Sequence, residues 1–167
     1  MSKELVSLDK VHIPRWSELP NVDLYIDQIV TFINSSLEKC ISQNEEPNND
    51  NQILTKTMIN NYVKNQLIEA PIKKKYSKSQ CAKIFVICIL KQVYSMNEIS
   101  KLIDIALKSS NIENAYNSFC TQFEQALSCA YKGLNFAQID SSDNNKYLLE
   151  VVLLSCCYKI YVQNITF

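Results

Sequence analysis

Glycine is almost absent from this chain, since Gly133 is the only glycine among 167 residues. Glycine adopts positive backbone φ more readily than any other residue, and the tight turns of β-sheets usually need it there. Loops that cradle phosphates and the dinucleotide-binding fingerprint also depend on glycine. The sequence therefore argues against nucleotide-binding loops of these types and predicts a mainly α-helical fold.

Apolar residues recur at three- and four-residue steps along most of the chain, as they do in amphipathic helices. Thr55 is a plausible N-cap, and the stretches SKSQ, from Ser77, and SMNE, from Ser95, are capping boxes that begin helices. The helix after Ser77 contains IFVICIL, which is apolar nearly all round and predicts a path through the core. We expect six helices, at about 21–41, 55–65, 78–93, 96–108, 112–132 and 144–163.

These elements predict three regions. Residues 1–20 form an irregular N-terminal arm that lays Trp16 on the core, and residues 21–108 form a helical region interrupted by the polar loop 42–52. Residues 109–167 form a C-terminal helical pair. This pair completes the core, forms a dimer interface or does both, and the residues leave these alternatives open. A pocket for a small-molecule effector ranks behind them, and no residue pattern supports one.

Positive charge is concentrated in one part of a chain whose formal net charge is zero. The segment from Thr55 to Lys91 holds eight lysines against one acidic residue, Glu69, which gives +7; the remaining residues carry −7. Any preference for a charged partner is therefore local, and an anionic partner is favoured by this segment.

The short helix 55–65 and the loop after it carry side chains suited to duplex DNA. With its inward residues removed, the helix presents types that contact phosphates or base edges: Lys56, Thr57, Asn60, Asn61, Lys64 and Asn65. Pro71 ends any helix there, and a tight hairpin or loop follows. Candidate phosphate contacts in this loop and at the next helix start are Lys73, Lys74, Lys75, Tyr76, Ser77 and Lys78.

A different function fits the same residues. Lysine runs are usually solvated loops, and a basic face can dock an acidic protein. The alternative is therefore a non-enzymatic interaction module, in which a flat positive patch lies beside exposed apolar side chains.

Two stretches, LPNVDLYIDQIV and LTKTMINNYVKNQLIEAPIKKKYSKSQCAKIFVICILKQVYSMNEISKLI, resemble a bacterial family described as domain of unknown function 1836. The resemblance covers about residues 13–107. TMINNYVKNQLIEAP…KKKYSKSQ also resembles the winged helix-turn-helix of MerR-family regulators. That resemblance implies that Asn60, Asn61, Tyr62 and Lys64 lie on a recognition helix, Leu67 and Ile68 on its closing pair, and Pro71, Lys73–Lys75 and Tyr76 in the wing.

The chain departs from the MerR pattern at several points. The wing lacks its glycine and flanking arginines, and Gln66 stands where a helix-ending glycine is common. Asn60 occupies a position that favours arginine. The loop 42–52 replaces a tight turn before the recognition helix.

The sequence gives little support for catalysis, a metal or a cofactor. The seven cysteines include no CxxC pair, and His12 is the only histidine. We therefore expect buried thiols in a reducing cytoplasm and no nucleophilic site. The N-terminus lacks the apolar segment of a signal peptide, and YLLEVVLLSCCYKIYV is too short for a membrane span and carries Glu150 and Lys159.

Together these features predict a cytoplasmic, non-enzymatic transcriptional regulator that binds double-stranded DNA as a homodimer. The 55–65 helix enters the major groove and the wing lysines neutralise flanking phosphates.

Overall fold

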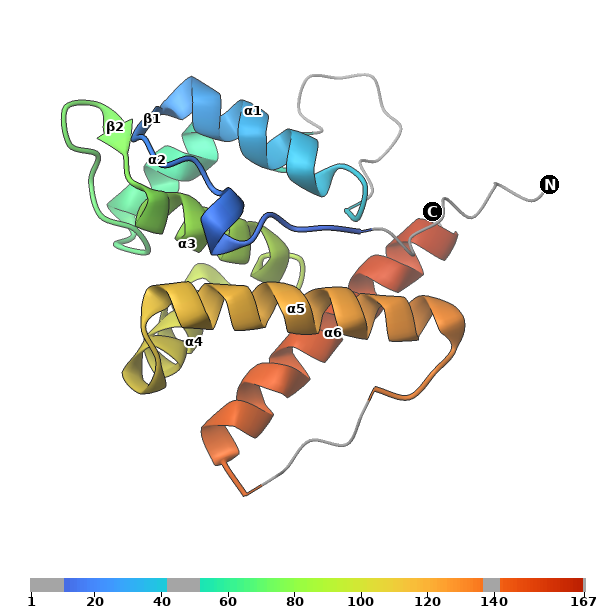
Figure 1. The fold of residues 1–167 in the computed structure, drawn as a ribbon. Helices are drawn as coiled ribbons and strands as arrows, with labels where there is room; N and C mark the ends of the chain where they lie inside the picture. Colours follow the sequence, from blue (N-terminus) through green and yellow to red (C-terminus); the bar gives the residue numbers. More distant parts are fainter. Residues whose placement is uncertain (1–10, 42–51, 137–141, 167) are drawn as a thin grey trace.

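The computed structural model describes residues 11–41, 52–136 and 142–166. Helices make up most of it, which confirms the mainly α-helical prediction (Figure 1). In chain order the elements are the 3-10 turn η2 (Trp16–Glu18), β1 (Leu24–Tyr25), α1 (Ile26–Leu37), α2 (Lys56–Lys64), β2 (Lys75–Tyr76), α3 (Lys78–Leu90), α4 (Met96–Ser109), α5 (Ile112–Lys132) and α6 (Asn144–Thr166).

Helix α3 is the centre of the molecule. Figure 1 shows α1, α2 and the strands on one side of α3 and the crossed helices α5 and α6 on the other. Nine of its thirteen residues are buried, as the apolar run IFVICIL predicts. The ring of Phe85 packs edge-on against Phe32 of α1 and at a tilt against Tyr116 of α5. This helix therefore joins the two sides through one continuous core.

The predicted helix starts are confirmed by their hydrogen bonds. The hydroxyl of Thr55 accepts from the backbone N–H of Met58, and Ser77 and Ser95 each begin a helix with a capping box. The single glycine has a matching role at a helix end. Gly133 closes α5 with φ of 64°, a left-handed conformation that glycine adopts without steric cost.

Residues 11–20 of the N-terminal arm are held against α5. The guanidinium of Arg15 donates two hydrogen bonds to the carboxylate of Glu124, at 2.7 and 2.6 Å, and the backbone N–H of Ile13 donates to the same carboxylate. Trp16 packs edge-on against Tyr116, as expected for an arm that covers the core. Residues 1–10 of the predicted arm lie outside the described residues.

The cysteines are free thiols, and all except Cys129 are buried. Burial raises the pKa of Cys40, Cys81, Cys88 and Cys156 to about 12, because the thiolate is poorly solvated in the core. The prediction of buried thiols is therefore confirmed for six of the seven.

The prediction that the last apolar run is too short for a membrane span is wrong. That run lies within α6, a helix of 23 residues, because its helical pattern continues at both ends. By length and composition alone, α6 is the one helix among the described residues that is able to cross a bilayer. One face of α6 packs against α5 and buries Val152, Leu153, Cys156, Cys157 and Ile160.

Candidate nucleic-acid interface

Helix α2 lies on α1 with its polar side outward. Ile59 and Tyr62 are fully buried beneath it. Just before the helix, the side chain of Asn34 both donates to the carbonyl of Leu54 and accepts from its N–H, at 2.8 and 3.0 Å. The Asn34 amide thus satisfies both backbone hydrogen-bonding groups of Leu54 and holds the segment that leads into α2. The exposed residues of α2 and its end are Lys56, Thr57, Asn60, Asn61, Lys64 and Asn65.

The end of α2 places Gln66 in a left-handed conformation, with φ of 59°. The N–H of Leu67 donates to the carbonyl of Tyr62, and the N–H of Gln66 donates to that of Val63, which is the Schellman pattern. Gln66 therefore occupies the left-handed position after the helix end, where glycine is favoured. Leu67 and Ile68, which follow it, are buried.

The lysine run forms a tight hairpin. Ile72 and Lys75 exchange both backbone hydrogen bonds, at 3.0 and 2.9 Å, across the two residues between them. Those residues, Lys73 and Lys74, have φ of 49° and 65°. Positive φ at both central positions defines a type I′ turn, which favours Asn-Gly. Each lysine in this conformation costs about 1–2 kcal/mol relative to an ordinary backbone conformation.

The hairpin and α2 meet at the start of α1. Strand β2 pairs antiparallel with β1, so that Lys75 lies opposite Tyr25. Two residues later along the chain, Asp27 forms an ion pair with Lys56 at the start of α2. Helix α2 and the hairpin therefore both lie beside the start of α1 (Figure 1). We call this region the α2–hairpin surface: Lys56, Thr57, Asn60, Asn61, Lys64, Lys73, Lys74, Lys75 and Lys78.

Neutral groups orient two of its lysines. The ammonium of Lys75 lies 5.0 Å from the ring centre of Tyr25. That of Lys78 lies 5.3 Å from the ring of Trp16 and donates to the side-chain oxygen of Asn21 at 2.9 Å. Aromatic rings attract cations without neutralising them. These lysines therefore keep their positive charge while their side chains are held in place.

Acidic residues neutralise only part of the positive segment. Asp27 pairs with Lys56, and Glu69 pairs with Lys83 at 2.6 Å. The hydrogen bond from Lys83 lowers the pKa of Glu69. Within the described residues, no acidic side chain forms an ion pair with Lys64, Lys73 or Lys74. Unpaired positive charge therefore includes Lys64 at the end of α2 and Lys73 and Lys74 at the tip of the hairpin.

Two predicted contact residues are engaged inside the protein. Tyr76 is only 3% exposed, and burial raises the pKa of its hydroxyl. The hydroxyl of Ser77 accepts from the N–H of Gln80, and its own N–H donates to the Gln80 side chain. Both residues therefore build the junction between the hairpin and α3, and we leave them out of the α2–hairpin surface.

The sequence did not indicate the residues that support this surface. Asn21, Trp16 and Tyr25 are distant in sequence from the lysines that they hold; Asn21 and Lys78 are 57 residues apart. No local pattern marks such partners. The exposed apolar side chains Val22 and Ile72, at 69% and 76%, were also missed. The spacing of Val22 placed it in the apolar pattern of the first helix, which is wrong because α1 begins only at Ile26, and Ile72 lies in a loop that has no periodic pattern.

The described residues hold no group of three or more histidine, cysteine, aspartate or glutamate side chains arranged to bind a metal ion. The loop 42–52, which we predicted to intervene before the recognition helix, lies almost wholly outside the described residues.

A family model described as Domain of unknown function (DUF1836) matches residues 14–119, which is more than half of the chain. No curated protein matches the sequence. No solved structure matches it.

Proposed function

We propose that this chain, which belongs to the family described as a domain of unknown function (DUF1836), is a DNA-binding transcriptional regulator with a MerR-like winged helix-turn-helix. In this proposal α2 is the recognition helix, which enters the major groove, and the Ile72–Lys75 hairpin is the wing. Support comes from the order of elements, in which a strand and α1 precede α2 and the wing pairs with that strand. We assign no catalytic role to the chain.

The turn conformation of Lys73 and Lys74 carries this proposal. Lysine has no conformational reason to occupy both positive-φ positions of a two-residue turn, where asparagine and glycine are favoured. Backbone strain of this kind is concentrated at functional sites. The result here is two exposed ammonium groups at the tip of a rigid hairpin, beside the exposed side of α2. That arrangement suits phosphates flanking a groove.

On α2, the amide side chains are the candidates for reading sequence. Asn60 and Asn61 are exposed next to each other in the middle of the helix. An asparagine is able to bond an adenine edge with two hydrogen bonds in the major groove. The hydroxyl of Thr57 and the ammonium of Lys64 lie on the same exposed side and contact the backbone of the duplex in this proposal.

The apolar outer face of α6 supports the proposal of a homodimer. Six large apolar side chains are 41 to 53% exposed on it: Tyr147, Leu148, Val151, Tyr158, Val162 and Ile165. Val151, Tyr158 and Ile165 recur every seven residues, so they lie along one stripe of the helix. A second copy that covers this stripe would present two recognition helices to a two-fold symmetric DNA site.

The decisive experiment is a binding titration with fluorescent duplex DNA from the gene's own upstream region, at several salt concentrations. The triple variant Lys73→Ala/Lys74→Ala/Lys75→Ala is compared with Lys101→Ala/Lys108→Ala, which removes two exposed lysines of α4. We expect tight, salt-dependent binding that only the first variant weakens. Each lost phosphate contact should reduce the slope of log K against log salt by about 0.9.

A second function has one observation in its favour. The exposed side chains of Val22, Tyr25 and Ile72 lie on or near the strands that carry the lysines. A basic patch with apolar neighbours also suits an acidic protein partner. Failure of the folded protein to bind any duplex at low salt would reject the regulator and favour this interaction module.

A further inference from the structure

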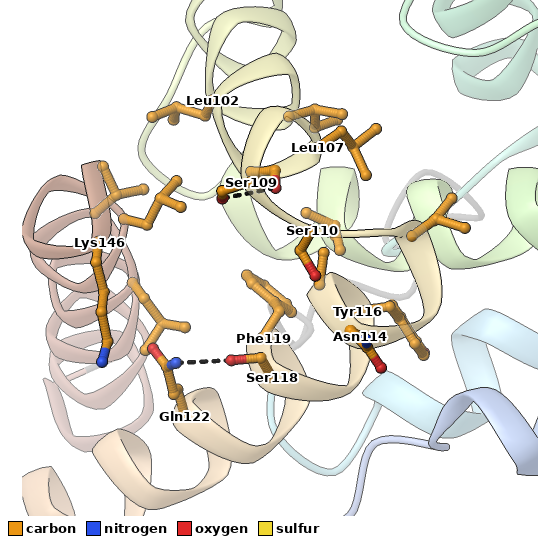
Figure 2. A pocket seen from close by; sticks show the side chains of 18 of the residues that line it. Leu102, Leu107, Ser109, Ser110, Asn114, Tyr116, Ser118, Phe119, Gln122 and Lys146 are labelled. Carbon is orange, nitrogen blue, oxygen red and sulfur yellow. Dashed lines mark hydrogen bonds between the residues drawn. The ribbon is translucent and has the colours of Figure 1, made fainter. Parts of the chain in front are cut away.

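A cavity of about 300 Å³ lies where α3, α4, α5 and α6 meet (Figure 2). Its walls come from all four helices, and it is distinct from the α2–hairpin surface. Small-molecule sites in proteins have volumes of about 300–1,000 Å³ and are lined mainly by apolar side chains with a few polar ones. The cavity is at the small end of that range.

The lining is mostly aliphatic and aromatic. Phe119 of α5 stacks on Phe123 with an angle of 10° between the rings, and this contact fixes its orientation at the cavity wall. Leu102 of α4 and Phe119 face the same space in Figure 2. Such walls favour a hydrocarbon group over water. The main apolar contributors are Val86, Leu90, Leu102, Ile103, Phe119 and Leu149.

Polar side chains lie together on one side of the cavity. The amide of Gln122 donates to the hydroxyl oxygen of Ser118 at 2.9 Å, which leaves the Ser118 hydroxyl hydrogen available to a ligand. Lys146 of α6 lies on the same side in the view of Figure 2. No acidic side chain forms an ion pair with Lys146 within the described part of the chain.

The other charged groups of the lining are already paired. Lys83 forms its ion pair with Glu69. Asp143 caps α6, because its carboxylate accepts from the backbone N–H groups of Asn145 and Lys146, at 3.0 and 3.2 Å. Lys146 therefore remains as the lining cation without an ion pair among the described residues, although its charge also acts on the Glu150 carboxylate one turn along α6, and it favours an anion.

We propose that this cavity binds a small amphipathic carboxylate, with its hydrocarbon chain among the α3–α6 side chains and its carboxylate against Lys146 and Ser118. The cavity volume of about 300 Å³ is at the small end of the range for small-molecule sites, which limits the ligand to a short hydrocarbon chain. A straight-chain acid the size of octanoate meets that limit. This inference does not depend on DNA binding, and its test uses no DNA.

The test is isothermal titration calorimetry of the full chain with sodium octanoate. We expect saturable binding at one site per chain, with a negative heat-capacity change from burial of the hydrocarbon. Neutral 1-octanol and cationic octylamine should bind more weakly than octanoate. Absence of saturable octanoate binding overturns the proposal, and equal binding of 1-octanol overturns the assignment of an anion.

Two pairs of variants locate the site. Ala106→Phe fills the cavity from α4 and should abolish binding, whereas Ala130→Phe, on α5 outside the cavity, should not. Lys146→Gln should weaken octanoate binding by about two- to fivefold, the size expected for an exposed ion pair, while Lys159→Gln on the same helix leaves it unchanged.

Circular dichroism checks that each variant is folded. Ala115→Leu replaces Ala106→Phe if the latter does not fold, since Ala115 also lines the cavity. Binding that survives a folded cavity-filling variant places octanoate elsewhere and overturns the proposal.

Discussion

The α2–hairpin surface and the outer face of α6 are both exposed, but they differ in chemistry and in backbone. The first is polar and cationic, and its hairpin keeps two lysines in a left-handed conformation. The second is a regular helix whose exposed stripe is apolar. The α2–hairpin surface is strained and charged, whereas the outer face of α6 is unstrained and apolar. This difference indicates different partners for the two surfaces. We propose DNA for the first and a second copy of the chain for the second.

The largest effect is expected for substitutions on the outer face of α6, which test the proposed dimer. Val151→Glu/Tyr158→Glu places a carboxylate twice on the exposed stripe, and burying unpaired charges in a dimer interface is costly. The dimer dissociation constant should rise by at least about a hundredfold. Size-exclusion chromatography with light scattering measures it. Lys159→Glu is the matched control, because it adds the same charge to the same helix.

The fold of the double α6 variant should persist, since both side chains are exposed. A dimer that survives the two carboxylates would show that another surface joins the copies. A wild-type chain that is monomeric at all accessible concentrations would remove the dimer from the proposal.

The second substitution keeps the turn of the hairpin but removes the positive charge of its two central lysines. Lys73→Asn/Lys74→Gly supplies the residues that a type I′ turn favours, so the free energy of unfolding should rise by about 1–2 kcal/mol. DNA affinity at low salt should nevertheless fall by about tenfold or more, because two phosphate contacts are lost. Urea unfolding and fluorescence anisotropy measure the two quantities. Unchanged affinity would contradict the wing assignment.

A smaller effect on stability is expected where the N-terminal arm is held against α5 by Glu124. Burial raises the pKa of Glu124, but the hydrogen bonds from Arg15 and Ile13 outweigh it, and the net pKa is lowered. A carboxyl whose pKa is lower in the folded state stabilises the protein above its unfolded pKa, and this contribution is lost as the pH falls through the folded pKa. Glu124→Gln should therefore reduce stability at neutral pH by about 1–2 kcal/mol.

Urea unfolding between pH 7 and pH 3 checks that behaviour. The difference between wild type and Glu124→Gln should shrink as the pH falls. A constant difference would show that the carboxylate charge is not what holds the arm. Exposed Glu113 of the same helix provides the control, Glu113→Gln, which should have little effect at any pH.

The smallest effect is at the end of α2. Gln66→Gly should stabilise the protein by about 1 kcal/mol, because glycine adopts the left-handed conformation there without the steric cost. Leu67 and Ile68 stay anchored, so DNA affinity should be unchanged. Thermal unfolding and anisotropy measure the two quantities. A loss of stability would mean that the Gln66 side chain contributes a contact of its own.

The sequence predicted the features that depend on neighbouring residues. Thr55, Ser77 and Ser95 begin their helices as expected, because a cap needs only the next turn. Features that depend on distant residues were missed. The first helix was predicted from Asn21 but begins at Ile26, because Leu24 and Tyr25 pair with β2.

Helices α3 and α6 show the same limit. Both are apolar nearly all round, yet α3 is buried on most sides and α6 exposes a stripe of large apolar residues. Composition alone does not distinguish a helix that crosses a core from one that closes its edge. The candidate site was predictable to the level of residue type, since exposed polar positions on α2 follow from its period. The positive φ of Lys73 and Lys74 and the aromatic rings that hold Lys75 and Lys78 were not predictable from the sequence.

The buried thiols have a consequence for how this protein loses its structure. In the folded chain, six cysteines are shielded from oxidants, and their raised pKa values leave them as unreactive thiols. Unfolding releases all seven at once with ordinary acidity. Without a reductant, random disulfides would then trap the unfolded chains, so heating becomes irreversible and the apparent melting temperature depends on scan rate. We therefore expect recovery of the fold after heating to depend on whether the buffer contains a reductant.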